Sequence, residues 1–224
     1  MRSLFEKHKV CILLPCYNNV AGVEAVIRQC LAITPHVLVV NDGSTDGSGD
    51  VIRTFDVLQV HYTVNRGKGY ALQTGFRKAL ESGYQYVISM DTDGQHYPQD
   101  CLQFLEKLEE EEGLLLVGAR NLNQENVPGK SSFGNRFSNF WFRLETGISL
   151  PDTQSGFRLY PVYRYRNSRF FTRKYEFEIE ILVRSAWKGI PVKSVPIGVF
   201  YPEREKRISH FRPGTDFFRI SILN

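Results

Sequence analysis

The sequence predicts a single α/β domain, built on a mostly parallel sheet with helices on both faces. Three observations support this fold class. The 224 residues suffice for one large domain. Short apolar runs alternate with segments of helical period through about residue 120. Polar clusters at 16–19, 41–44 and 91–96 each follow an apolar run, and parallel strands would bring them to one sheet edge.

The elements follow in order along the chain. Continuous apolar or β-branched runs of four to six residues are typical of buried strands, and apolar residues at three- and four-residue spacing are typical of helices. These patterns predict strands at 10–15, 37–40, 86–90 and 114–117, a weaker strand near 57–63, and helices around 23–31, 71–80 and 101–108.

The pattern changes after residue 120. Residues 124–136 are typical of a polar loop, and 137–144 of a short aromatic helix. The segment "YEFEIEILVRSAWKG" alternates like a strand at first, while its length and the closing Gly189 favour a helix. "IPVKSVPIGVF" predicts an extended segment, which its prolines confine to a sheet edge.

Charge is distributed unevenly between the two parts of the chain. Residues 1–157 hold 14 Lys and Arg against 18 Asp and Glu, a net charge of −4. Residues 158–224 hold 14 Lys and Arg against 6 Asp and Glu, a net charge of +8. An acidic part suited to a metal therefore precedes a basic part suited to phosphates or an anionic membrane, although a solvated basic surface is an equally simple explanation.

The four cysteines form no CxxC pair and lie in apolar segments, which favours reduced thiols in a cytosolic protein. The longest apolar runs are too short to span a bilayer. Because residues 1–9 are polar, we expect no signal peptide. The expected location is cytoplasmic.

Two aspartates in "VISMDTDGQHYPQD" lie just beyond a predicted strand. If the segment is extended, the oxygens of Asp91, Asp93 and Gln95 project to one side and suit Mg²⁺ or Mn²⁺. An EF-hand would need Gly and Glu where His96 and Leu102 stand, which excludes it. The alternative is a turn in which Asp93-Gly94 only reverses the chain.

Two further segments have the composition of a nucleotide site. "VVNDGSTDGSGD" offers exposed amides beyond a strand, and Asp42 could accept hydrogen bonds from a base or ribose. "NRGKGYALQTG" lacks the third glycine of a dinucleotide fingerprint, because Leu72 stands in its place, so a dehydrogenase is rejected. Arg66 and Lys68 at a helix start are candidate phosphate contacts, with plain surface charge as the alternative.

The ordered motifs "LLPCYNN", "VVNDGSTDGS", "NRGKGYALQTGF", "MDTDGQH", "GAR" and "DTQSGFRLY" resemble those of family 2 glycosyltransferases, in particular dolichol- and polyprenol-phosphate mannosyltransferases. The resemblance covers about residues 8–200. It implies a Rossmann-like GT-A fold, a GDP- or UDP-hexose donor, a divalent metal and an inverting transfer. It also implies a nucleotide-binding half at about 8–120 and an acceptor half at about 121–200, together forming a catalytic domain over 1–200.

The resemblance also implies roles for individual residues. By position, Pro15, Tyr17 and Asn18 would line the nucleotide pocket, with Asp42 at the base or ribose. Asp91, Asp93 and Gln95 would hold the metal. Arg120 and Arg136 match basic positions for the acceptor phosphate, and Glu180 matches an acidic position on the helix that closes the site. The sequence departs from the family pattern at Asn19 and at Asn41, where acidic residues are usual.

The acceptor class determines whether a base is needed. A polyprenyl phosphate is already ionised and needs only a cationic cradle, for which the candidates are Arg120, Arg136, Arg158, Arg204 and Arg207. A saccharide or lipid hydroxyl would need a base, for which Asp152 in "DTQSGFR" is the candidate. A non-catalytic nucleotide-sugar binding module is a further alternative, which the paired aspartates argue against.

The segment 201–224 interleaves basic and aromatic residues. It suits an anionic membrane surface or closure over a lipid phosphate, and an amphipathic helix packed on the core is the alternative. Nucleic-acid binding is not expected, because no known module appears and the first part of the chain is acidic. The sequence thus predicts an inverting, metal-dependent hexosyltransferase acting on a lipid phosphate through peripheral contact with the cytosolic membrane face.

Overall fold

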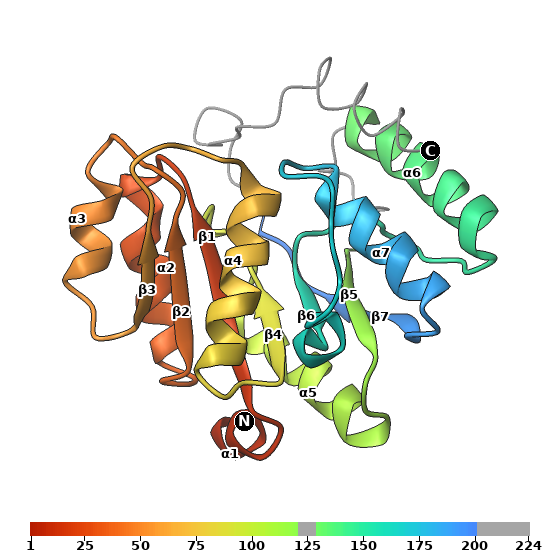
Figure 1. The fold of residues 1–224 in the computed structure, drawn as a ribbon, viewed down its shortest axis with the longest axis horizontal. Helices are drawn as coiled ribbons and strands as arrows, with labels where there is room; N and C mark the ends of the chain where they lie inside the picture. The colour runs from red at the N-terminus through yellow and green to blue at the C-terminus, as the bar shows by residue number, and fades with distance from the viewer. Residues whose placement is uncertain (121–128, 201–224) are drawn as a thin grey trace.

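The computed structural model describes residues 1–120 and 129–200, with the side chains of 129–133 excepted. A twisted sheet runs through its centre and helices cover both faces (Figure 1). The described part contains seven strands in the order β3-β2-β1-β4-β6-β5-β7. Their bounds are β1 Val10–Cys16, β2 Val37–Asn41, β3 Leu58–His61, β4 Tyr86–Ser89, β5 Leu115–Arg120, β6 Arg158–Tyr160 and β7 Val192–Ile197.

All strand pairs are parallel except those of β6, which runs antiparallel to both β4 and β5. The strand near 57–63 and the edge strand at β7 are confirmed, and β7 carries Pro196 beside a single neighbour, β5. The sequence patterns did not predict β6, because a three-residue strand is too short to show a period. The fold is therefore the predicted α/β class with one antiparallel insertion.

The helices form two layers. In one layer, α1 (Arg2–Lys7), α2 (Val20–Leu31), α3 (Ser48–Arg53) and α5 (Cys101–Glu110) pack on one side of the sheet. In the other layer are α4 (Lys68–Glu81), α6 (Gly129–Thr146) and α7 (Phe177–Trp187). Strand β1 contributes side chains to both cores, because alternate residues of a strand point to opposite faces of the sheet. Ile12 and Leu14 pack under the first helix layer, and Cys11 and Leu13 pack under the second. Short 3₁₀ turns, η1 (Pro98–Asp100) and η2 (Val162–Tyr165), complete the elements.

The segment after residue 120 differs from the prediction at one point. Helix α6 begins at Gly129, eight residues before the predicted start, so 129–136 is helical rather than loop. Its composition (Gly, Lys, two Ser, Phe, Gly, Asn, Arg) has weak helix propensity, which explains the error. The ambiguous "YEFEIEILVRSAWKG" contains helix α7, as its length indicated. Residues 201–224, including the predicted ligands Arg204 and Arg207, lie outside the described residues.

The four cysteines are free and buried, as predicted for packed thiols. Burial raises the pKa of the Cys16 thiol to about 11 and that of Cys30 to about 12, and it raises the pKa of Cys11 and Cys101 further. At neutral pH these side chains therefore behave as small apolar groups.

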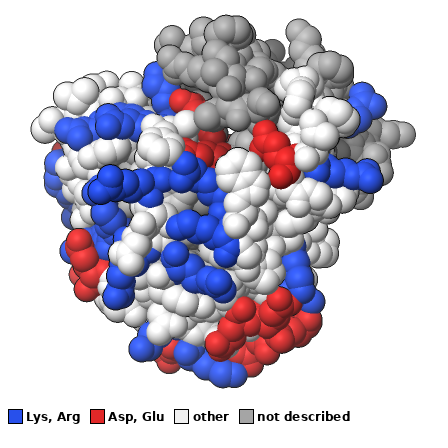
Figure 2. All heavy atoms as spheres, turned by 45° about the vertical axis from the view of Figure 1, so that its right-hand side comes forward, with Lys and Arg blue, Asp and Glu red and all other residues white. Residues whose placement is uncertain are grey.

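Figure 2 shows how charge lies on one face of the molecule. Lys and Arg side chains spread over much of this face, whereas acidic side chains form separate groups, one of them at the lower end. At the carboxyl end of α5, Glu109 pairs with Lys7, and Glu111 with Lys193. The acidic run 109–112 is thus a surface feature remote from the carboxyl ends of the strands.

Candidate active site

The polar clusters that follow β1, β2 and β4 converge at one sheet edge, as predicted. The backbone amide of Asp42 donates to the carbonyl of Cys16 at 2.8 Å, and that of Asn18 donates to Ser44 Oγ at 3.0 Å. Asn19 Nδ2 donates to the carbonyl of Thr92. The three loops therefore hold one another by direct hydrogen bonds. The predicted donor contacts Pro15, Tyr17 and Asn18 lie at the end of β1 in this group.

An acidic centre follows β4. Asp91 lies 2.8 Å from the ammonium of Lys68, which begins α4 and is also 3.2 Å from Glu178 on α7. Burial is the largest single influence and would raise the pKa of Asp91, but the charge and hydrogen bond of Lys68, together with the charges of His96 and Arg158, lower that pKa. Burial similarly opposes the charge on Lys68, and Asp91 and Glu178 together raise the pKa of Lys68. Asp91 and Lys68 are thus both ionised at neutral pH.

Gly156, in the loop before β6, allows this contact. A Cβ on Gly156 would lie 2.7 Å from both Asp91 Oδ2 and Lys68 Nζ. Any larger residue would push the carboxylate and the ammonium apart. The motif "DTQSGFR" therefore contributes a close backbone approach to the acidic centre.

Asp93 is exposed and in a different electrostatic state. Although its side chain reaches solvent, the surrounding protein removes part of its hydration, and this desolvation, followed by the like charge of Asp91, raises the pKa of Asp93 to about 6. Asp93 Oδ1 accepts a hydrogen bond from the amide of Gln95 at 3.0 Å. Residues 92–94 form a turn, so the expectation of an extended segment with three side chains on one side is wrong. Metal binding by Asp91, Asp93 and Gln95 stays a prediction.

The carboxylate oxygens near the end of β4 fit a divalent cation that is bound together with a substrate. Among the described side chains, no three Asp, Glu, His or Cys groups form a ready-made cation cage. Asp91 and Asp93 nonetheless offer two hard oxygen ligands whose mutual repulsion, seen in the raised pKa of Asp93, a cation would relieve. Mg²⁺ commonly binds through one or two carboxylates, with phosphates and water completing its shell. The residues therefore fit the metal that the resemblance implies.

Asp42 lies at the predicted edge, but its carboxylate faces the 65–67 loop. It is 2% exposed and accepts hydrogen bonds from the amides of Arg66 (2.9 Å) and Gly67 (2.8 Å) and from Asn65 Nδ2 (3.1 Å). Gly43, with φ +71°, lies so close to the backbone of this loop that a Cβ would meet Asn65 N at 2.4 Å. The carboxylate thus holds the 65–67 loop, and its contact with a base or ribose stays a prediction.

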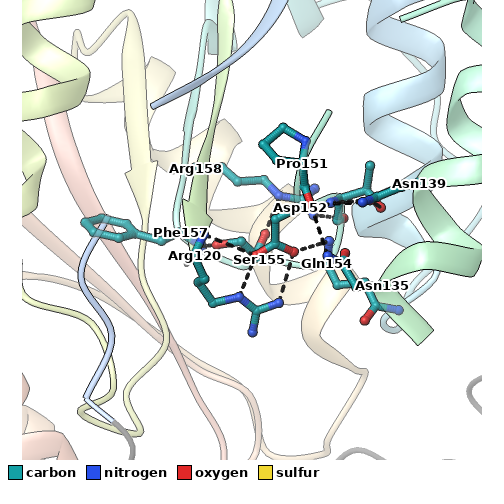
Figure 3. A network of polar contacts seen from close by, with 10 residues as sticks. Arg120, Asn135, Asn139, Pro151, Asp152, Gln154, Ser155, Phe157 and Arg158 are labelled. Atoms are coloured by element: carbon teal, nitrogen blue, oxygen red, sulfur yellow. Dashed lines mark hydrogen bonds and ion pairs between the residues drawn. The ribbon is translucent and has the colours of Figure 1, made fainter. Parts of the chain in front are cut away.

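A second charged cluster joins β5 to the loop before β6 (Figure 3). Arg120 Nε donates to Asp152 Oδ2 at 2.6 Å, and Arg120 Nη2 donates to Asp152 Oδ1 at 3.0 Å. Asp152 is fully buried, and its Oδ1 also accepts from the amide of Gln154 at 3.1 Å. This carboxylate is committed to orienting an arginine, so it is not placed to act as the base considered above.

Arg158 is enclosed by backbone carbonyls. Its side chain is fully buried, and its guanidinium donates to the carbonyls of Ser155 (2.6 Å), Glu178 (2.5 Å) and Thr153 (2.8 Å). Because all three guanidinium nitrogens donate to backbone carbonyls, Arg158 links β6 to α7 and has no nitrogen left without a protein partner for an acceptor phosphate. Arg136, by contrast, is exposed on α6, and its predicted role stays a prediction.

Glu180 lies on α7, and its predicted role at the site stays a prediction. Its carboxylate accepts hydrogen bonds from the amides of Phe171 and Thr172 and pairs with Arg184 at 3.0 Å, so it fixes the 171–172 segment. Glu178, two residues earlier, faces Lys68 instead. Sequence reasoning missed Glu178, because three glutamates alternate in "YEFEIE" and only the helical phase separates them.

His96 is a buried residue near both charged clusters that was not singled out from the sequence. Burial lowers the pKa of His96 to about 4, although Asp91 and Asp152 both act to raise it. Its ring packs against Phe157 with centroids 5.0 Å apart. The imidazole is thus neutral at pH 7 and lies within electrostatic range of both the acidic centre and the Arg120–Asp152 pair.

Comparison with solved structures confirms this architecture. The chain superposes on glucosyl-3-phosphoglycerate synthase from Mycobacterium tuberculosis, crystallised with Mn²⁺, UDP and phosphoglyceric acid, with a TM-score of 0.73 and 20% identity. The match covers 99% of this chain and 77% of that chain. Fold and site together define the class of the protein: a glycosyltransferase with the GT-A fold. The model of glycosyl transferase family 2 matches residues 11–168, and the chain belongs to this family.

Curated relatives agree with the family assignment. An undecaprenyl-phosphate mannosyltransferase from Micrococcus luteus is 29% identical over 88% of this chain and 85% of its own length. A polyprenol monophosphomannose synthase from Mycolicibacterium smegmatis is 28% identical over 90% of this chain and 80% of its own length. A UDP-N-acetylglucosamine–dolichyl-phosphate N-acetylglucosaminyltransferase from Methanococcus voltae is 24% identical over 87% and 86%. The predicted resemblance is therefore confirmed, and the protein is an enzyme rather than a non-catalytic binding module.

Within residues 1–120 and 129–200, no helix has the length and apolar character needed to cross a bilayer.

Proposed function

We propose that this enzyme transfers a hexose from a nucleotide-sugar to a polyprenyl phosphate, with a divalent metal and with inversion at the anomeric carbon. The observation that carries the proposal is the pairing of the partly exposed Arg120 with the buried Asp152, which positions a guanidinium and leaves no available base there. The relatives from Micrococcus luteus and Mycolicibacterium smegmatis, both named for lipid-phosphate mannosyl transfer, support the same acceptor class.

The acceptor argument follows from proton chemistry. A hydroxyl nucleophile must lose its proton to a base within hydrogen-bond reach. Asp152 is fully buried and bonded to Arg120, so the hydroxyl alternative is not favoured. A phosphate monoester is already anionic and needs a positioned cation instead. A guanidinium held in plane by a carboxylate suits phosphate recognition, because its donors match the phosphate oxygens.

On the donor side, Asp91 and Asp93 would hold Mg²⁺ or Mn²⁺, with Gln95 as the predicted third ligand. The bound metal would neutralise the charge that develops on the departing nucleoside diphosphate. Lys68 holds Asp91 and Glu178 in place and keeps the net charge of the centre low. Attack by the acceptor on the face opposite the diphosphate gives inversion. With a lipid acceptor, the reaction takes place at a membrane surface, and we place it on the cytosolic side.

A double-mutant cycle tests the acceptor class. Asp152→Asn and Arg120→Lys should each lower kcat/KM for a short-chain prenyl phosphate by about tenfold to a hundredfold, the worth of a hydrogen bond between charged groups. If Asp152 acts through Arg120, the double variant should be no worse than the poorer single variant.

The matched control is Asp50→Asn, which breaks the exposed Asp50–Arg53 pair on α3 and should leave turnover unchanged. The outcome that contradicts the proposal is equal turnover with the corresponding prenyl alcohol, together with loss of activity in Asp152→Asn but not in Arg120→Lys. That pattern would indicate a base.

A further inference from the structure

Helix α6 has two faces of opposite character. The inward face is buried through Asn135, Ser138 and Phe142. The outward face exposes Phe140 at 60% and Leu144 at 64%. Residues four apart lie one turn apart on the same side of a helix, so these two side chains form one apolar stripe. Figure 1 shows α6 on the outside of α7, away from the sheet.

Trp187, at the end of α7, extends this stripe. It is 67% exposed, and its Nε1 donates to the carbonyl of Glu145 at 3.1 Å, which fixes the indole beside the end of α6. We call Phe140, Leu144 and Trp187 the α6 apolar face. Tryptophan is enriched at membrane–water interfaces, because its ring is large and amphipathic.

Cations border the α6 apolar face. Arg143 and Lys188 are exposed beside Leu144 and Trp187 in the sequence, and Arg136 is exposed two turns before Arg143. The only acidic residue of α6 is Glu145, and burial raises the pKa of its carboxyl group. The surface therefore combines aromatic and aliphatic side chains with net positive charge, which complements an anionic lipid surface.

We propose that the α6 apolar face docks on an anionic phospholipid bilayer. The proposal rests on the proposed function, because it places the enzyme where a polyprenyl phosphate would be. A second copy of the chain fits less well. A stable dimer buries about 800 Å² on each partner, far more than three side chains supply, and a twofold contact would bring Arg143 and Lys188 towards their own copies.

The inner face of α6 connects this surface to the site. Asn135 Nδ2 and Asn139 Nδ2 donate to the carbonyl of Pro151 at 3.1 and 2.9 Å, and the amide of Thr153 donates to Asn139 Oδ1 at 2.9 Å. These hydrogen bonds hold Pro151 and Thr153, on either side of Asp152, and Asp152 in turn orients Arg120 (Figure 3). A bilayer held by the outer face of α6 would therefore lie one helix away from the arginine proposed to meet the lipid phosphate.

The test is co-sedimentation of the full chain with vesicles of phosphatidylcholine alone and of phosphatidylcholine mixed with phosphatidylglycerol. Wild type should bind the anionic vesicles, and less strongly as salt is added. Phe140→Ser combined with Leu144→Ser should weaken binding at least about tenfold, because their apolar area stays in water. Arg143→Gln should weaken it by about fivefold, the effect of one cation near the surface.

Val64→Ser is the matched control, since Val64 is 66% exposed on a different part of the molecule and should not affect vesicle binding. Turnover of a short-chain, water-soluble prenyl phosphate should be unchanged in the Phe140/Leu144 variant, which separates docking from catalysis. The proposal is overturned if the variant binds anionic vesicles like wild type, if Val64→Ser is equally impaired, or if wild type is a dimer that this variant disrupts. If wild type does not turn over the prenyl phosphate at all, that result would instead count against the proposed function.

Discussion

Asp91 and Asp93 carry the same side chain but differ in proton affinity. Lys68 lowers the pKa of Asp91, while burial and the neighbouring Asp91 raise the pKa of Asp93 to about 6. In the cation-free protein, the folded state therefore binds more protons than the unfolded chain between the ordinary pKa of 3.8 and about 6. The contribution of Asp93 to the free energy of unfolding therefore falls as the pH rises through that window. A bound cation, which favours the ionised carboxylate, would oppose this loss of stability.

The prediction is a pH-dependent metal affinity. Because Asp93 must lose its proton to bind a cation, the apparent Mn²⁺ affinity should rise about tenfold per pH unit below pH 6 and level off above it. Titration calorimetry with donor nucleotide present measures this. Asp93→Asn should bind Mn²⁺ weakly at every pH, whereas Asp56→Asn, at an exposed loop position, should match wild type. Undiminished affinity in Asp93→Asn would show that the cation binds elsewhere.

Sequence alone predicts which residue types gather at the site, but not which partner each carboxylate takes. Asp42 and Asp152 are both at the predicted edge. The carboxylate of Asp42 accepts hydrogen bonds from amides 24 and 25 residues later in the chain, whereas that of Asp152 pairs with an arginine 32 residues earlier. Glu178 and Glu180 differ by two positions, or about 200° around a helix, so one faces Lys68 and the other Arg184. Such choices depend on tertiary contacts that local patterns do not encode.

At the scale of elements, the insertion of β6 shapes the site. This antiparallel strand separates β4 from β5 and carries the preceding loop to the edge where Gly156 meets Asp91. Arg158 at the start of β6 bonds the carbonyl of Glu178, and so links this insertion to α7. The longer strands and helices were predictable from their periods. Strand β6 and the first turns of α6 were not, because the former is too short and the latter lack helix-favouring residues.

Arg158→Lys should therefore destabilise the fold rather than change acceptor use. A lysine keeps the charge but cannot reach three carbonyls with a planar fork, so at least one buried carbonyl loses its partner at a cost of about 1–3 kcal/mol. In a domain of this size, that corresponds to a fall in Tm of roughly 2–10 °C. Thermal unfolding and acceptor KM are measured together, with Lys193→Arg at the exposed end of an ion pair as control. A raised acceptor KM at unchanged Tm would contradict the structural role.

At the scale of the whole molecule, parallel strand order explains why the site could be located before its contacts were known. Strands β1, β2 and β4 are neighbours in the sheet, so the loops that follow them must meet at one edge. The position of the site is therefore a property of topology, whereas its electrostatics depend on α4 and α7, which supply Lys68 and Glu178 from the second layer.

Donor binding should raise the stability of the entire domain. A ligand that binds only the folded state at a hundredfold its Kd adds about 2.7 kcal/mol to the free energy of unfolding. We expect one of the GDP- or UDP-hexoses, with Mn²⁺ present, to raise Tm by several degrees more than the others. The shift should disappear in Asp93→Ala, while Asp56→Ala should keep it. Equal shifts for all donors, or a shift that survives in Asp93→Ala, would contradict a metal-assisted donor site.

The four buried thiols have a practical consequence. Since each is enclosed and protonated at neutral pH, the native protein offers no reactive background to maleimide reagents. A single cysteine introduced at Leu144 would then be the sole attachment point for an environment-sensitive fluorophore, whose emission would report directly whether that helix leaves water when lipid is added.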